Sequence, residues 1–140
     1  MPEYLFVYGT LRQCAQRRAA GNRCYQLLQQ HASLLGQGRL QAKLYLVDYY
    51  PGAVPSTDVT DQVSGELYLL SQPEFVLPLL DKYEECGPGF AQPQEYRREQ
   101  QSVIMENGDT VIAWVYVYNR STDRLRLIKG GDFLADKVTR

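Results

Sequence analysis

The chain has 140 residues, of which 44% are hydrophobic, and its 15 Lys and Arg against 16 Asp and Glu give a formal net charge of −1. This length is typical of one domain with one hydrophobic core, so we expect a single domain over residues 1–140. The near-neutral charge supplies no field that would hold a polyanion, which argues against nucleic-acid binding. No apolar stretch reaches membrane-spanning length and the N-terminus lacks the pattern of a signal peptide, so we expect no membrane association.

The few residues suited to metal binding or redox chemistry also limit the possible functions. Three cysteines without CxxC spacing predict neither a disulfide framework nor a zinc site, and they suit a reducing cytoplasm. The single histidine, His31, rules out a multi-histidine metal site, and we expect it on a helix surface or in packing. We therefore expect no metal, and any chemistry here should be carried by carboxylates or tyrosines.

The first predicted element is a strand over residues 4–8, an unbroken apolar and aromatic run. Such a run indicates a core strand that is buried on both faces. Gly9 follows directly, and the backbone N–H groups of a turn over residues 9–11 can form an anion-binding concavity. A plain strand-to-loop turn is the structural alternative.

A helix is predicted next, over residues 23–35, because apolar residues recur there at helical spacing, with Gly36 as its stop. The residues in this stripe are Tyr25, Leu28, Ala32 and Leu35. A strand over residues 39–47 follows. Two prolines and a glycine then predict a rigid loop over residues 49–56, whose tyrosines either line a pocket or cover the core.

A second internal strand is predicted over residues 63–70, where Gly65 indicates a bulge or a close approach of two backbones. Ser71 and Pro73 together mark the start of a helix. We expect Pro78 to break this segment into a turn and a short helix. The residues predicted to share its apolar face are Phe75, Leu79, Leu80 and Tyr83.

A β-hairpin is predicted over residues 96–105 and 110–118, because Asn107-Gly108 lies between two β-rich runs. A glycine-rich turn over residues 128–133 closes the domain. These elements amount to about five strands and two or three helices. They predict an α+β fold with a small, mostly antiparallel sheet that can curl into a barrel.

Glu84 is the candidate for acid–base chemistry. In a helix over residues 79–85 it lies one turn after Leu80, at the end of the apolar face. Burial at such a position raises the pKa of a glutamate toward the range in which it exchanges protons near neutral pH. A helix-end glutamate that points into water is the alternative.

In their order and spacing these motifs resemble those of the γ-glutamylcyclotransferase-like proteins, from Tyr4 to about Asp132. The length and the LDxYE form are most similar to the short γ-glutamylamine cyclotransferase (AIG2-like) branch. The motifs are YGTL at 8–11, YPGA at 50–53, GELY at 65–68, LDxYE at 80–84, EYRR at 95–98, VYVYN at 115–119 and GGDF at 130–133.

The resemblance implies a small mixed β-barrel with flanking helices and an enzyme that needs no cofactor. Its activity would convert a small-molecule γ-glutamyl amide into 5-oxoproline and a free amine. Glu84 would be the catalytic acid/base. The residues implied in substrate binding are Tyr8, Gly9, Thr10 and Leu11, and Tyr116 is a candidate pocket hydroxyl.

One position departs from the family pattern, because Glu85 stands where a glycine is common. A second carboxylate beside Glu84 can raise the pKa of Glu84 further or repel an anionic substrate. The alternative function is a non-catalytic module that binds a small ligand or a protein on the same barrel. The sequence leaves the amine half of the substrate and the oligomeric state open.

Overall fold

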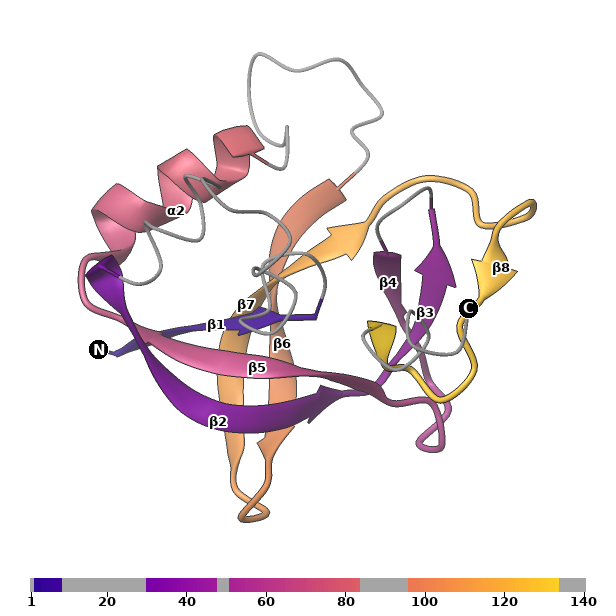
Figure 1. Ribbon diagram of the computed structural model, residues 1–140, viewed down its shortest axis with the longest axis horizontal. Helices are drawn as coiled ribbons and strands as arrows, with labels where there is room; N and C mark the ends of the chain where they lie inside the picture. Colours follow the sequence, from indigo (N-terminus) through magenta and orange to yellow (C-terminus); the bar gives the residue numbers. More distant parts are fainter. Residues whose placement is uncertain (1, 9–29, 48–50, 84–95, 134–140) are drawn as a thin grey trace.

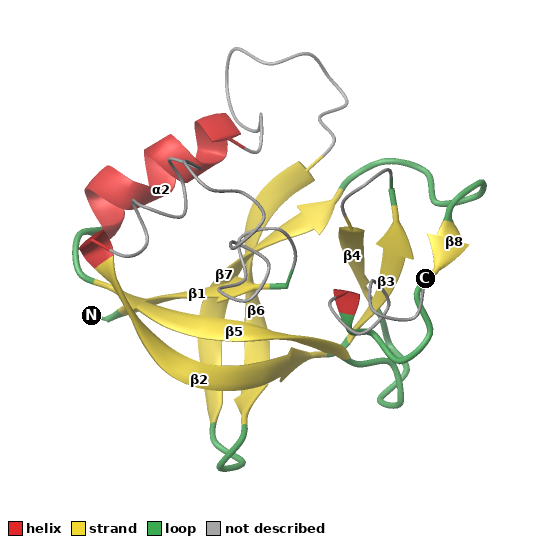
Figure 2. Ribbon diagram, in the orientation of Figure 1, coloured by secondary structure: helices red, strands yellow, loops and turns green. Residues whose placement is uncertain are grey.

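The computed structural model describes residues 2–8, 30–47, 51–83 and 96–133, which form eight strands and one helix (Figures 1 and 2). The elements are β1 (Glu3–Val7), β2 (Ala32–Leu40), β3 (Ala42–Leu46), β4 (Pro51–Pro55), β5 (Val63–Leu70), α2 (Pro73–Tyr83), β6 (Tyr96–Met105), β7 (Thr110–Tyr118) and β8 (Arg126–Leu127).

Five of the strands close into a barrel in the order β1-β5-β2-β6-β7. All neighbours are antiparallel except β1 and β7, which pair in parallel where Leu5 meets Trp114. The other three strands form a separate sheet in the order β4-β3-β8. In Figure 1, α2 and this sheet lie on opposite sides of the barrel. The predicted α+β fold with a mixed, mostly antiparallel barrel is confirmed.

Strand β1 is the core strand that its sequence predicts, since Leu5, Phe6 and Val7 are all buried. Its side chains alternate between two hydrophobic clusters, as expected for a period of two. Leu5 and Val7 join the cluster that contains the buried residues of α2, whereas Phe6 joins the cluster that reaches β3 and β4.

Strand β5 shows the close backbone approach that Gly65 predicts. A Cβ atom at Gly65 would lie 2.5 Å from the carbonyl oxygen of Val7 and 2.6 Å from the Phe6 ring. Only glycine fits between the two strands here. The irregularity in register lies in the neighbouring strand β2, between Leu34 and Gly36.

The β6–β7 hairpin has the predicted bounds. Its turn is formed by Asn107, whose side-chain oxygen accepts a hydrogen bond from the Asp109 N–H at 2.9 Å, and by Gly108, with φ of 92°. This hairpin carries several residues of the candidate site.

The predicted helix over residues 23–35 is wrong at its C-terminal end. Residues 30 and 31 are helical, but β2 begins at Ala32 and pairs with β5 from Ala32 to Leu40. The helical spacing of Ala32 and Leu35 is overridden by hydrogen bonds to β5 and β6, which local periodicity does not encode. Residues 23–29 lie outside the described residues.

The segment from residue 39 to 56 also differs from its prediction. The single strand expected over residues 39–47 is two strands, β2 and β3, because the chain bends at Gln41. The expected loop over residues 49–56 contains strand β4. Its prolines, Pro51 and Pro55, are tolerated because β4 is an edge strand and they occupy its first and last positions.

Helix α2 continues through Pro78, contrary to the predicted break. A proline at this position removes the hydrogen bond to the carbonyl of Glu74. Glu74 and Pro78 both lie on the exposed side, where water can solvate that carbonyl, while Val76, Leu77 and Leu80 are buried against the barrel. Burial of the face formed by Val76, Leu77 and Leu80 stabilises the helix across Pro78.

The apolar face of α2 was therefore only partly predicted, since Phe75 is 50% exposed and Leu79 is 38% exposed. Ser71 marks the start of the helix without capping it, because its hydroxyl donates to the His31 carbonyl, whereas the Gln72 carbonyl accepts from the N–H of Val76. The His31 ring packs edge-on against Phe75 with centroids 5.2 Å apart, so its packing role is confirmed.

Candidate active site

Two of the predicted site residues, Tyr8 and Tyr116, come together although 108 positions separate them. The Tyr8 hydroxyl donates to the main-chain carbonyl of Tyr116 at 2.5 Å and accepts from the N–H of Ala53 at 3.0 Å. These two bonds join the end of β1 to β7 and β4. The other predicted site residues, Gly9, Thr10, Leu11 and Glu84, lie outside the described residues.

The side chain of Tyr116 extends the connection to α2. Its hydroxyl donates to Oδ1 of Asp81 at 2.7 Å. Asp81 lies in the last turn of α2, two residues before the helix ends at Tyr83. Tyr116 thus links the end of β1 through its carbonyl to the end of α2 through its hydroxyl.

Asp81 is also held by Arg98 of β6. The guanidinium donates through Nε to Oδ1 at 2.7 Å and through NH2 to Oδ2 at 3.0 Å. The two side chains are only 21% and 22% exposed, so water screens the pair less than it would on an open surface. We refer to Asp81, Arg98 and Tyr116 as the Asp81 cluster.

An aromatic ring supports this cluster from the neighbouring strand. The Arg98 guanidinium carbon lies 4.4 Å from the ring centroid of Trp114, within the range of a cation–π interaction. Trp114 is the one tryptophan in the sequence. Its fluorescence therefore reports on the surroundings of Arg98.

Two tyrosines of the hairpin pack in the same hydrophobic cluster as Tyr116. Tyr96 and Tyr118 pack edge-to-face with ring centroids 5.7 Å apart, and the Tyr96 hydroxyl donates to the Pro51 carbonyl at 2.6 Å. The loop tyrosines predicted either to line a pocket or to cover the core, Tyr49 and Tyr50, lie outside the described residues.

Strand β5 carries a buried carboxylate, Glu66, on the same face as Tyr68. Glu66 is 2% exposed and accepts a hydrogen bond from the Tyr68 hydroxyl at 3.3 Å. It pairs in register with Val7, two residues before Gly9. Within the described residues it is the one charged side chain that is buried to this extent.

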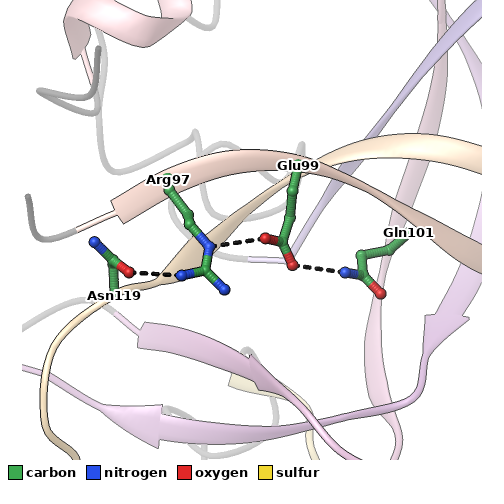
Figure 3. Close-up of polar contacts among 4 residues, drawn as sticks. All are labelled: Arg97, Glu99, Gln101 and Asn119. Carbon is green, nitrogen blue, oxygen red and sulfur yellow. Dashed lines mark hydrogen bonds and ion pairs between the residues drawn. The ribbon is translucent and has the colours of Figure 1, made fainter. Parts of the chain in front are cut away.

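The opposite face of β6 carries a different polar network (Figure 3). Arg97 donates to Glu99 at 2.8 Å and to Asn119 at 2.8 Å, and Gln101 donates to the other oxygen of Glu99 at 2.6 Å. The Arg97 side chain is 56% exposed. Neighbouring arginines therefore point to opposite faces, and only Arg98 contacts α2.

Sequence reasoning missed the roles of Asp81 and Arg98. Both lie inside the motifs LDxYE and EYRR, but of the residues in these two motifs only Glu84 was assigned a role. The available signal was the opposite charge of Asp81 and Arg98. It could not show that Arg98, rather than Arg97, forms the ion pair.

Two further kinds of feature are absent from the described ranges. No group of three or more His, Cys, Asp or Glu residues there could hold a metal ion. No helix in those ranges is both long and apolar enough to cross a membrane.

Comparison with known proteins finds relatives along almost the whole chain. Residues 5–135 match the family described as gamma-glutamyl cyclotransferase, AIG2-like. The γ-glutamylcyclotransferase family protein YtfP of Escherichia coli K12 is 34% identical over 131 residues, which cover 93% of this chain and 95% of that protein.

Two other relatives extend this comparison. The γ-L-glutamyl-butirosin B γ-glutamyl cyclotransferase of Niallia circulans is 37% identical over 124 residues, covering 83% of this chain and 67% of that protein. The crystal structure of an AIG2-like protein from Mus musculus has a TM-score of 0.65 at 25% identity, and the match covers 91% of this chain and 86% of that one.

Proposed function

Since the chain belongs to the γ-glutamyl cyclotransferase, AIG2-like family, we propose that it converts a γ-glutamyl amide into 5-oxoproline and a free amine. The relative from Niallia circulans is named for a reaction on a γ-L-glutamyl compound. The proposed substrates are small γ-glutamyl amides, including γ-glutamylamines.

The reaction is an intramolecular acyl transfer. The α-nitrogen of the glutamyl group attacks its γ-carbonyl carbon, a new C–N bond closes the five-membered ring, and the original amide C–N bond breaks. Two protons pass from the α-nitrogen to the departing nitrogen. No electrons are exchanged with a second molecule, so the step requires no redox cofactor.

Proton transfer is the task that we assign to Glu84. A carboxylate there takes a proton from the α-ammonium, which makes the nitrogen nucleophilic, and gives it to the departing nitrogen. It transfers the second proton in the same way when the ring nitrogen loses it. The protein also has to keep the flexible glutamyl chain folded for ring closure. Good orientation of this kind can contribute roughly 7–11 kcal/mol.

The turn over residues 8–11 is proposed to bind the substrate through its backbone N–H groups, which suit either the α-carboxylate or the developing oxyanion. The side chain of Tyr8 contributes differently, because its hydroxyl bonds to Tyr116 and Ala53 inside the barrel. We therefore expect Tyr8 to act on the substrate through its main chain.

Tyr116 is proposed to line the pocket. Its hydroxyl proton is donated to Asp81, so the oxygen can offer a ligand only its lone pairs. The complementary group on a γ-glutamyl substrate is the α-ammonium, which is a hydrogen-bond donor. Tyr116 would then hold the nitrogen that has to be deprotonated.

A connected pair of hydrogen bonds gives the proposal its main support. The hydrogen bonds from Tyr8 to Tyr116 and from Tyr116 to Asp81 tie the end of β1 to the end of α2. Gly9 follows β1 within two residues and Glu84 follows α2 directly. The described ends of the two segments that the proposed mechanism needs are therefore linked by this pair of hydrogen bonds.

The test is to incubate the purified protein with a panel of γ-glutamyl amides and to assay 5-oxoproline. We expect product from at least one amide, which would identify the leaving amine. Glu84→Gln should retain the fold and lose at least about 100-fold in kcat, because it removes the general acid/base.

No product from any amide, with a folded protein, would contradict the proposal. It would favour a non-catalytic module that binds a small ligand or a protein. Glu85→Gly should then be tested for restored turnover, since Glu85 replaces the glycine common at this position.

A further inference from the structure

The Asp81 cluster ties the last turn of α2 to two strands of the barrel. Arg98 on β6 and Tyr116 on β7 are directly opposite each other in the strand register. Both donate to the Asp81 carboxylate, in three hydrogen bonds of 2.7 to 3.0 Å. A two-pronged arginine–carboxylate pair fixes orientation as well as distance.

The cluster is supported by rigid elements. Strands β6 and β7 pair continuously from Tyr96↔Tyr118 to Ile104↔Thr110. Trp114 lies two residues from Tyr116 on β7 and stacks against the Arg98 guanidinium. Arg98 is thus held from one side by a ring and from the other by Asp81.

The backbone of helix α2 explains why contacts between its last turn and the barrel matter. Pro78 removes one hydrogen bond from the helix interior, and the last carbonyls of any helix lack partners within it. The helix therefore has one backbone hydrogen bond fewer than an uninterrupted helix, and its last carbonyls are not held within it. The buried Leu80 and the Asp81 cluster both connect the last turn to the barrel.

We propose that Asp81 and Arg98 are positioning residues, which fix the last turn of α2 and thereby the part of the chain that directly precedes Glu84. This inference rests on the proposed function, in which Glu84 is the acid/base. A displacement of about 1 Å in a catalytic group can reduce the rate on the order of 100-fold. The Asp81–Arg98 pair thus acts on the rate of the chemical step rather than on substrate affinity.

Asp81 does not itself serve as the base in this proposal. Its two carboxylate oxygens accept hydrogen bonds from Arg98 and Tyr116, and a carboxylate paired with a guanidinium is a poor proton acceptor. Replacing Asp81 should therefore lower the rate and leave the shape of the pH–rate profile unchanged.

The experiment compares kcat and KM for Asp81→Asn and Arg98→Lys with those of the wild type, using the best amide of the panel. Asparagine keeps the shape of Asp81 without its charge, and lysine keeps the charge of Arg98 without the planar fork. We expect kcat to fall on the order of 100-fold for Asp81→Asn and less for Arg98→Lys, with KM changed less than about threefold.

Arg97→Gln is the matched control. It removes an arginine and an ion pair from the same strand, on the face that does not contact α2. It should leave kcat, KM and the fluorescence of Trp114 unchanged. Arg98→Lys should alter that fluorescence, since Trp114 is the one tryptophan and it stacks on Arg98.

Amide hydrogen exchange provides a readout that does not depend on activity. In Asp81→Asn, residues 79–83 should exchange on the order of tenfold faster, while the β6–β7 hairpin stays protected. This shows whether the variant remains folded and whether the end of α2 has loosened.

The outcomes separate the two proposals. An active wild type, a loosened helix end and a lower kcat with an unchanged pH profile support the positioning role. An active wild type with unchanged kcat in Asp81→Asn overturns it, as does a rise confined to KM. If the wild type forms no 5-oxoproline from any amide, the proposed function fails and the positioning role in that reaction fails with it, even where hydrogen exchange shows the attachment.

Discussion

At the scale of single residues, tyrosine hydroxyls make the connections that local sequence patterns do not reveal. Tyr8, Tyr96 and Tyr116 each donate to a group on another element. Their rings are buried or partly buried in a hydrophobic cluster while their hydroxyls satisfy main-chain or carboxylate oxygens. A phenol suits this task because it has an apolar body and a polar tip.

Tyr8→Phe should destabilise the protein by about 1–3 kcal/mol, because it leaves the buried N–H of Ala53 and the carbonyl of Tyr116 without this partner. Urea unfolding followed by far-UV circular dichroism measures the loss. Tyr45→Phe is the control, since the Tyr45 hydroxyl makes no hydrogen bond in the described part of the chain. Equal stability of the two variants would show that the Tyr8 hydroxyl contributes nothing.

At the scale of elements, burial outweighed local propensity. Strand β2 formed where helical spacing predicted a helix, because its backbone pairs with β5 and with β6. Helix α2 formed across a proline because Val76, Leu77 and Leu80 are buried against the barrel. In both cases contacts with distant segments stabilise a conformation that the local sequence disfavours.

Pro78→Ala should stabilise the protein by about 1–3 kcal/mol, because it restores the backbone hydrogen bond to Glu74 and removes the steric conflict of the proline ring. Pro78 is exposed, so the exchange costs little packing. The urea midpoint should rise with an unchanged slope. A lower midpoint would show that the ring itself makes a contact that stabilises α2.

At the scale of the whole molecule, the C-terminal segment connects the barrel to the second sheet. The N–H of Ile128 donates to the Leu44 carbonyl on β3, and the Gly131 carbonyl accepts from the N–H of Ser64 on β5. The predicted glycine-rich turn is confirmed, with φ of 85° at Gly130 and 66° at Gly131. Gly131 is also packed against the backbone of Gln62.

Gly131→Ala should cost at least about 3 kcal/mol, because its Cβ would lie 1.8 Å from the Gln62 carbonyl oxygen in addition to the strain of a positive φ. Gly130→Ala is the matched control. It has the same class of φ and no atom within 4 Å of the new Cβ, so only the strain of about 1–2 kcal/mol remains. Similar losses in both variants would contradict this packing argument.

The same unfolding curves test the expected single domain. Trp114 fluorescence reports on the barrel, whereas far-UV circular dichroism reports on all strands and α2. For one cooperative unit the two transitions should coincide in the wild type. Separate midpoints would show that the barrel and the second sheet unfold independently.

The sequence alone determined the features whose signals lie within a few residues. The apolar run of β1, the Asn107-Gly108 turn of the hairpin and the ordered motifs led to the α+β barrel and to the family. Local spacing encodes burial and turn geometry directly, so these predictions required no knowledge of distant partners.

Only the tertiary structure decided which residues meet. Asp81 and Arg98 lie 17 positions apart and Tyr8 and Tyr116 lie 108 apart, and their bonds form only when the barrel has closed. Pairing with β5 made β2 a strand, and the edge position of β4 in the second sheet allowed prolines at its two ends. The physical reason is that hydrogen bonds and burial between distant segments contribute more free energy than the local preferences they override.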